Sequence, residues 1–130
     1  MLAATAEVRR TLPTFRHLLA TRPSDIEDYW LKVGFPRSDG ETEYLWLDHL
    51  SWNGDSVTGV LQNDPEKVPG RHAGDQVTVK QNAISDWAYL KHGQAFGNFT
   101  TRVLLRHASP EIAKEVSKTL SPEPLEPGRP

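Results

Sequence analysis

Residues 29–35 read Tyr-Trp-Leu-Lys-Val-Gly-Phe, and this stretch decides the fold. Its large apolar residues fall at every second position, at Tyr29, Leu31, Val33 and Phe35. Side chains alternate between the two faces of a strand, so a period of two predicts a strand with one buried face.

Similar segments follow along the chain. Strands are predicted over residues 43–50, 57–62, 75–80, 84–90 and 96–105. Asn53-Gly54 is the strongest hairpin signal between them, because both residues tolerate a positive φ. Most connections are too short for parallel crossovers, which need a dozen residues or more. We therefore expect a twisted antiparallel sheet of five or six strands in meander order.

The N-terminal segment carries a helical pattern. Val8, Leu12, Phe15 and Leu19 are spaced four, three and four residues apart, which places them on one helix face. Pro13 interrupts this pattern, and a proline inside a helix costs about 3 kcal/mol. The sequence therefore predicts two short N-terminal helices, one over residues 4–10 and a second that begins near residue 11.

The C-terminal part predicts one further helix and a tail. Ser109 followed by Pro110 is typical of an N-cap and the first helical position. After Leu120, four prolines lie within ten residues, and such a segment is expected to be disordered. The chain is thus predicted to be a single α+β domain over residues 1–120 with a Pro-rich disordered tail over residues 121–130.

Composition excludes several classes of function. The chain has 130 residues, 15 Lys plus Arg against 17 Asp plus Glu, a net charge of -2 and no cysteine. This balance argues against a general nucleic-acid binder and against a polybasic membrane anchor. No disulfide or thiol nucleophile is possible. With no apolar run of about 20 residues and no secretory signal, we expect a cytoplasmic protein without membrane or nucleic-acid partners.

Signatures of catalysis and metal binding are missing. The histidines show no helical i,i+4 pair, and no serine lies in a G-x-S-x-G elbow. Asp48 and His49 are adjacent in a predicted strand, where neighbouring side chains point to opposite faces and cannot hold one ion together. No metal and no cofactor are predicted.

Asp86 is the most conspicuous acid. It lies between Ile84 and Ala88 on a predicted inward face, where a carboxylate must be paired or hydrogen-bonded. Arg102, predicted in the next strand, is the expected partner. A structural ion pair or a turn-capping carboxylate is the favoured interpretation, and a functional acid is the alternative.

The aromatic residues suggest a binding surface. Three of the four Trp and all three Tyr lie in the predicted strands, on both faces, and Trp52 follows the strand predicted over residues 43–50. One sheet face cannot bury all of them, so some rings either cover a helix, line a groove or meet a partner. The candidate binding residues are Trp46, Trp87, Tyr89, Asp86, Arg102 and Asn98.

Several motifs resemble the YegJ-like family of small bacterial proteins. They are Leu31-Lys32-Val33-Gly34-Phe35, Glu43-Tyr44-Leu45-Trp46-Leu47, Ile84-Ser85-Asp86-Trp87-Ala88-Tyr89 and Gly97-Asn98-Phe99-Thr100-Thr101-Arg102. The resemblance spans roughly residues 7–115. It implies a bacterial cytoplasmic domain, and it brings no catalytic residue and no cofactor.

Three functions remain open from the sequence. The preferred one is a non-catalytic binding module that presents Trp46, Trp87 and Tyr89 to a protein or a small molecule. The alternative is a small hydrolase that uses Asp86 or Asp48 with a histidine. Sequence-neutral RNA binding by stacked aromatic residues would require a basic stripe on the sheet. The oligomeric state is not predicted.

Overall fold

The computed structural model describes residues 2–127, which form two compact units. Unit 1 contains the residues up to Asp28 and those from Asp86 onward, and unit 2 contains Tyr29–Ser85. The elements of the chain are α1 (Leu2–Thr21), β1 (Asp28–Pro36), β2 (Thr42–Asn53), β3 (Ser56–Leu61), β4 (Gln76–Lys80), the 3-10 turn η1 (Gln81–Ala83), β5 (Ile84–Lys91), β6 (Gln94–Gly97), α2 (Phe99–Leu105) and α3 (Pro110–Ser117). The predicted α+β class is confirmed.

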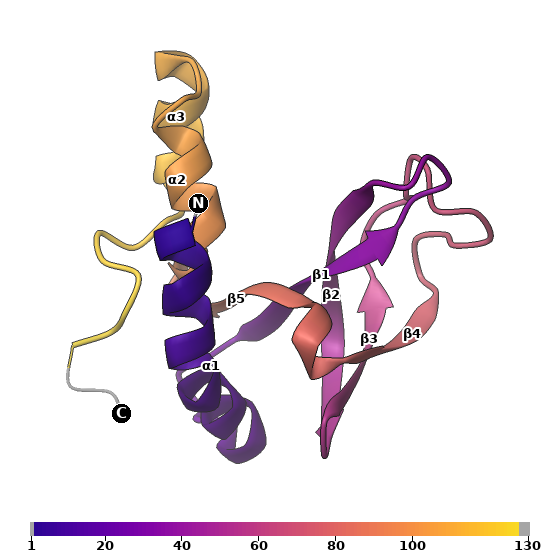
Figure 1. The fold of residues 1–130 in the computed structure, drawn as a ribbon. Helices are drawn as coiled ribbons and strands as arrows, with labels where there is room; N and C mark the ends of the chain where they lie inside the picture. Colours follow the sequence, from indigo (N-terminus) through magenta and orange to yellow (C-terminus); the bar gives the residue numbers. More distant parts are fainter. Residues whose placement is uncertain (1, 128–130) are drawn as a thin grey trace. The chain divides into compact units, whose positions relative to one another are not determined.

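Unit 2 is built on an antiparallel sheet, in which β2 and β3 form a long hairpin (Figure 1). Leu47 lies opposite Leu31 on β1 and opposite Leu61 on β3, and all three side chains are buried. Buried and more exposed residues alternate along β1 and β3. The period of two therefore correctly predicted one buried face.

The turn of this hairpin lies one residue later than predicted. Asn53 pairs with Ser56, so Gly54 and Asp55 form the two-residue turn. Gly54 has a φ of +60°, and a turn with glycine at its first central position suits the twist of a hairpin. Asn53 is thus the last residue of β2 instead of the first residue of the turn.

The strand order departs from the predicted meander at one step. The sheet order is β4-β3-β2-β1-β5-β6, so β5 follows β4 in the chain but not in the sheet. The turn η1 redirects the chain between them, and the Gln81 N–H donates to the Asp55 carbonyl at 2.7 Å. At the start of β5, the Ser85 hydroxyl donates to the Lys32 carbonyl of β1 at 3.4 Å.

The predicted pair of N-terminal helices is wrong, because α1 continues through Pro13. Pro13 is on the exposed side, whereas Val8, Phe15 and Leu19 are buried on the opposite side. Each buried side chain of this size contributes about 1.5–3 kcal/mol. Burial along the whole helix therefore offsets the roughly 3 kcal/mol that one interior proline costs.

The predicted last strand over residues 96–105 is also wrong. The strand β6 ends at Gly97, and α2 begins at Phe99. Gly97 and Asn98 have φ values of +81° and +52°, a backbone conformation that cannot continue a strand. Within residues 2–127, the chain therefore has one N-terminal helix and two C-terminal helices. The second of these, α3, has the predicted Ser109 cap, whose side chain accepts the Ile112 N–H.

The core of unit 1 is centred on Trp87. Its indole lies 5.3 Å from the Phe15 ring, 5.8 Å from Tyr89 and 5.5 Å from Phe99, measured between ring centroids. The indole N–H donates to the Thr11 hydroxyl at 2.9 Å, which satisfies its one polar atom. This single side chain thus connects α1, β5 and α2.

Part of the predicted disordered tail, residues 128–130, lies outside the described residues. Within the described part, Ser121 is buried and the Gly97 N–H donates to the Pro124 carbonyl at 2.7 Å. The division of the chain into a domain of residues 1–120 and a tail stays a prediction.

Gly97 offers a test of the packing around Trp87. A Cβ at this position would lie 2.3 Å from the Trp87 carbonyl oxygen, and the φ is positive as well. We expect Gly97→Ala to lower the free energy of unfolding by about 3 kcal/mol or more, through backbone strain together with steric overlap. Gly93→Ala is the matched control, since its φ is +75° but open space surrounds it. Urea denaturation should show that Gly93→Ala lowers the free energy of unfolding by about 1 kcal/mol. Equal losses for Gly97→Ala and Gly93→Ala would contradict this account.

Candidate functional site

The Asp86 carboxylate is a buried cap on the first turn of α2. It accepts the backbone N–H groups of Phe99 at 3.1 Å and Thr100 at 2.9 Å, and the Thr100 hydroxyl at 2.5 Å. It also accepts the N–H of Trp87 at 2.8 Å. Asp86 is fully buried, and four donors compensate its lost hydration. The interpretation as a capping carboxylate is confirmed.

The predicted ion pair between Asp86 and Arg102 is not formed. Arg102 lies on α2 instead of a strand, and its guanidinium donates to the Gly97 and Ser121 carbonyls at 2.8 and 2.7 Å. It also reaches the Ala95 carbonyl at 3.3 Å and the Ser121 hydroxyl at 3.0 Å. Burial lowers the pKa of Arg102, and the nearby negative charges of Asp86 and Glu123 oppose this effect. Arg102 thus joins β6 to the C-terminal segment.

Asn98 connects β6 to α2 and contacts Trp87 through its backbone. Its N–H donates to the Trp87 carbonyl at 2.9 Å, and its φ is +52°. Its side chain does not cap α2, a role that Asp86 fills from a distant strand. Asp86, Asn98 and Arg102 therefore meet at the β6–α2 junction.

The aromatic candidates separate into two groups. Trp87 and Tyr89 are only 1% and 2% exposed in unit 1, so their rings present almost no surface. Trp46 is half-buried and belongs to β2 in unit 2. The predicted aromatic surface from Trp46, Trp87 and Tyr89 therefore retains Trp46 alone as a ring with substantial exposure.

Unit 2 offers other aromatic rings beside Trp46. Trp46 and Tyr44 alternate along β2 with the buried Leu45 and Leu47, so they lie on the opposite side of the strand. On β1, the same rule places Trp30 and Lys32 opposite to the buried positions. Lys32 lies directly across from Trp46. We name Trp30, Lys32, Tyr44 and Trp46 the aromatic face. The alternation in the sequence alone could have identified Trp30 and Tyr44.

Tyr44 is the most exposed member of the aromatic face. It is 54% exposed and lies opposite Gly34. A Cβ on Gly34 would be 3.3 Å from the Tyr44 ring, so the ring covers this glycine. The Lys32 ammonium is 5.7 Å from the ring centroid, within the range of a cation–π contact. These contacts hold an exposed ring in place, which lowers the entropy it would lose on binding.

Asp48 and His49 contact each other, although the sequence predicts that neighbouring side chains in a strand point to opposite faces. The His49 Nδ1 lies 2.8 Å from the Asp48 Oδ1. A β-bulge shifts the register between Asp48 and Ser51, and His49 has a φ of +48°. The bulge turns the two side chains together, whereas a regular strand would direct them to opposite faces. The His49 side chain is 79% exposed, so this pair lies open to solvent.

Two cavities of unit 1 lie beside Arg102. One of about 440 Å³ is lined by Ala3, Ala4, Glu7, Phe99, Arg102, Val103, Arg106, Pro122, Glu123 and Pro124. The other, of about 550 Å³, is lined by Gln94, Arg102, Leu105, Arg106, Ala113, Ser117, Lys118, Leu120, Ser121 and Pro122. Neither Asp86 nor a histidine lines either of them, which does not support the hydrolase geometry for Asp86.

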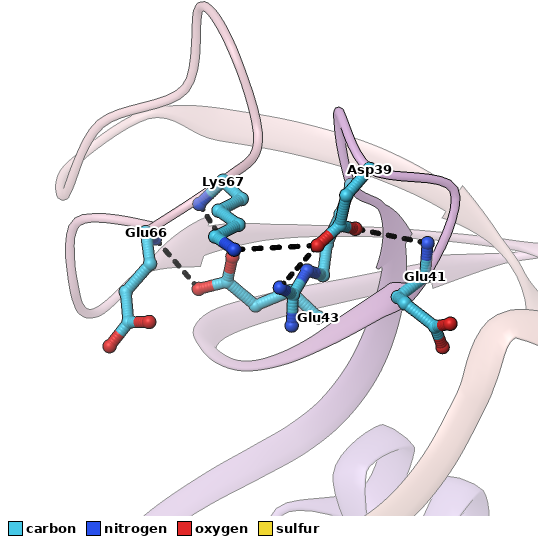
Figure 2. A network of polar contacts seen from close by, with 6 residues as sticks. Asp39, Glu41, Glu43, Glu66 and Lys67 are labelled. Carbon is cyan, nitrogen blue, oxygen red and sulfur yellow. Dashed lines mark hydrogen bonds and ion pairs between the residues drawn. The ribbon is translucent and has the colours of Figure 1, made fainter.

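A second polar network holds the loops of unit 2 (Figure 2). The Glu43 carboxylate accepts the N–H groups of Glu66 and Lys67 at 2.8 and 2.9 Å. Asp39 accepts the Glu41 N–H at 3.1 Å and pairs with Arg37. These backbone hydrogen bonds are the main causes that lower the pKa of both Glu43 and Asp39. The network secures the loop after β3 to the start of β2.

Metal-binding clusters and membrane-spanning helices are both missing from the part of the chain that the structure describes. Between Leu2 and Pro127, no three His, Asp or Glu side chains come together as a metal-binding group. Among the same residues, no helix has the length and apolar composition needed to cross a bilayer.

The role of Asp86 can be measured by substitution. Asp86→Asn replaces one carboxylate oxygen with an amide donor that would face the N–H donors of α2, so we expect a loss of about 3 kcal/mol in the free energy of unfolding. Thr100→Val removes one donor and leaves the carboxylate, so it should cost about 1 kcal/mol. Urea denaturation followed by circular dichroism measures both. An Asp86→Asn chain as stable as the native one would show that the cap is dispensable.

The Glu43 network predicts a dependence on pH. The folded-state pKa of Glu43 is lowered, so its stabilising contribution is present above the ordinary value of 4.5 and is lost as pH falls through the lower folded value. The amide signals of Glu66 and Lys67 should therefore shift with a midpoint below 4.5 in an NMR titration. Glu43→Gln should abolish this transition. If the amide signals of Glu66 and Lys67 shift with pH in that variant as they do in the native chain, the transition belongs to another group.

Comparison with known proteins places the chain in a family. The model of the family described as "Uncharacterized protein conserved in bacteria (DUF2314)" matches residues 1–121. The chain is 32% identical over 81 residues to "Uncharacterized protein YegJ" of Escherichia coli (strain K12), covering 62% of this chain and 53% of that protein. It is 34% identical over 67 residues to "Putative ankyrin repeat protein NMB1133/NMB1171" of Neisseria meningitidis serogroup B (strain ATCC BAA-335 / MC58), covering 51% of this chain and 26% of that protein.

The similar region is only part of each relative. It spans about half of the Escherichia coli protein and about a quarter of the Neisseria protein. No solved structure matches the chain. The family match covers most of the sequence and includes all the motifs on which the predicted YegJ-like resemblance rests. The chain therefore belongs to the bacterial DUF2314 family, and the resemblance is confirmed.

Proposed function

We propose that the chain is a non-catalytic binding module and that unit 2 binds a partner protein through the aromatic face. The observation that carries this proposal is Tyr44, which is 54% exposed on a sheet face that also carries the half-buried Trp30 and Trp46. Tyr and Trp are the residues most often responsible for binding energy at protein interfaces. Of the six binding residues predicted from the sequence, Trp46 belongs to this surface.

The geometry of the face suits a protein more than a buried small molecule. Its residues lie on one side of β1 and β2, and neither of the two cavities described above includes them. Small ligands are usually held in concave pockets, whereas protein interfaces are flatter with aromatic residues at their centre.

The name of one relative gives independent support. A stretch similar to this chain occurs within a protein named as an ankyrin repeat protein. Ankyrin repeats stack into extended surfaces that bind other proteins. A domain that occurs together with such repeats is consistent with a role in protein interaction.

The test uses the intact chain as bait. Native protein, a Tyr44→Ser/Trp46→Ser double variant and a Thr78→Ala variant are immobilised and exposed to bacterial extract. Thr78 is the control because it lies on β4, where its hydroxyl contacts Thr58 of β3, and neither of these strands carries a residue of the aromatic face. A partner retained by the native and Thr78→Ala chains is then purified, and its Kd is measured by calorimetry.

We expect the double variant to weaken that Kd by at least tenfold, or about 1.4 kcal/mol. Circular dichroism confirms that the variant is folded. If the folded double variant retains the same partners with the same Kd, the aromatic face is not the binding surface and the proposal fails.

A hydrolase remains the second candidate, and the Asp48–His49 contact is the observation that favours it. A carboxylate that accepts from Nδ1 can orient an imidazole as a general base. Hydrolysis of a panel of p-nitrophenyl esters by the native chain, abolished by His49→Ala, would favour this candidate over the binding module.

A further inference from the structure

The C-terminal segment of residues 119–126, which we name the strap, lies along the edge of β6. The Ala95 N–H donates to the Thr119 carbonyl at 2.7 Å, and the Ser121 N–H donates to the Ala95 carbonyl at 3.0 Å. Ala95 and Leu120 form a parallel bridge. The strap therefore occupies a sheet edge in the way that a bound peptide does when it adds a strand.

Arg102 contacts the strap at Ser121. Its guanidinium donates to two β6 carbonyls, those of Ala95 and Gly97, and to the carbonyl and hydroxyl of Ser121. The Gly97 N–H donates to the Pro124 carbonyl at 2.7 Å. On the strap, these contacts use the carbonyl oxygens of Ser121 and Pro124 and the Ser121 hydroxyl. None of them requires a backbone N–H group at residue 122 or 124. A proline is therefore accepted at both positions.

A charged contact holds the far end of the strap. The Glu126 carboxylate accepts the Tyr89 hydroxyl at 2.7 Å and also pairs with the Lys91 ammonium. The hydrogen bond to Glu126 is the main cause that raises the pKa of Lys91, and Asp25 lies 3.4 Å from the same ammonium. This end thus recognises a carboxylate at a fixed distance from the Arg102 contact.

The strap fits its position incompletely. Ser121 is its only buried residue among residues 119–126. The two cavities of about 440 and 550 Å³ both have Pro122 in their walls. The strap is therefore held mainly by polar contacts and leaves adjacent volume unfilled. Another segment with the same polar groups and larger side chains would bury more apolar surface there.

We propose that the edge of β6, with Arg102, Tyr89 and Lys91, is a peptide-binding groove that the strap occupies in this structure. Its ligand is an extended, proline-containing segment of a partner protein, with a carboxylate five residues after the residue that contacts Arg102. The strap is the intramolecular competitor of that segment. This groove is formed by residues of unit 1, whereas the aromatic face is formed by residues of unit 2.

The test measures binding of a labelled peptide to the full chain. The probe is fluorescein-labelled Thr-Leu-Ser-Pro-Glu-Pro-Leu-Glu-Pro, the sequence of residues 119–127. Glu126→Gln weakens the strap within the protein, whereas Glu111→Gln removes the same charge from an exposed position of α3, outside the strap. We expect the Glu126→Gln chain to bind the probe about tenfold more tightly than the native or Glu111→Gln chain, because a tethered competitor lowers the apparent affinity.

A second peptide tests the carboxylate without altering the protein. Replacing the glutamate at the position of Glu126 with glutamine should weaken binding to the Glu126→Gln chain about tenfold, because the contact with Lys91 and Tyr89 is reduced. Equal affinity for both peptides, or no gain in the folded Glu126→Gln chain, would overturn the proposal. Dimer formation by that chain without peptide binding would also overturn it, in favour of strap exchange between two copies.

Discussion

The hydrogen bonds of the buried Asp86 carboxylate are the constraint on which unit 1 depends. One side chain on β5 satisfies the first donors of α2, thirteen and fourteen residues further along the chain. The same interaction fixes where β6 must end, because the chain reverses through Gly97 and Asn98 before the helix begins. Arg102 then projects from α2 toward β6, and the strap contacts follow from its position. The Asp86 carboxylate, for which the sequence also allowed a functional role, thus has a structural role as the cap of α2.

The local pattern predicted the elements whose burial alternates. The strands β1 to β5 follow the period-two segments to within two or three residues at most ends, and Ser109 marks the start of α3. Sequence reasoning failed where a distant group decides the local structure. The helix α2 has β-branched residues and no local cap, so nothing nearby in the sequence indicates a helix, and its cap comes from Asp86. Likewise, α1 passes through Pro13 because burial on its other side is distributed over the whole helix.

The candidate site was predictable to a similar extent. In the structure, Trp46 and Tyr44 lie on the side of β2 that is opposite to the buried leucines, and the alternation of side chains along the sequence would have allowed this prediction. Trp87 packs against rings from α1 and α2, and Tyr89 stacks on Trp87 and on Phe96 of β6. The alternation within β5 cannot reveal these contacts. The contact between Asp48 and His49 required a bulge, and a bulge has no clear signature in one sequence.

The aromatic face and the β6 groove differ in the chemistry that each offers to a partner. The aromatic face offers rings whose binding energy comes from apolar burial, whereas the β6 groove offers backbone groups, a guanidinium and an ammonium. Apolar burial offers no charge for salt to screen, whereas the attraction between a ligand carboxylate and Lys91 weakens as salt increases.

The distribution of tryptophan has a spectroscopic consequence. Trp87 is the one indole of unit 1 and is shielded from water, whereas Trp30, Trp46 and Trp52 are half-buried residues of unit 2. An indole in a dry environment fluoresces at shorter wavelength than one in contact with solvent. The blue and red edges of the emission band therefore report on different units, and unfolding of each can be followed in the unlabelled chain.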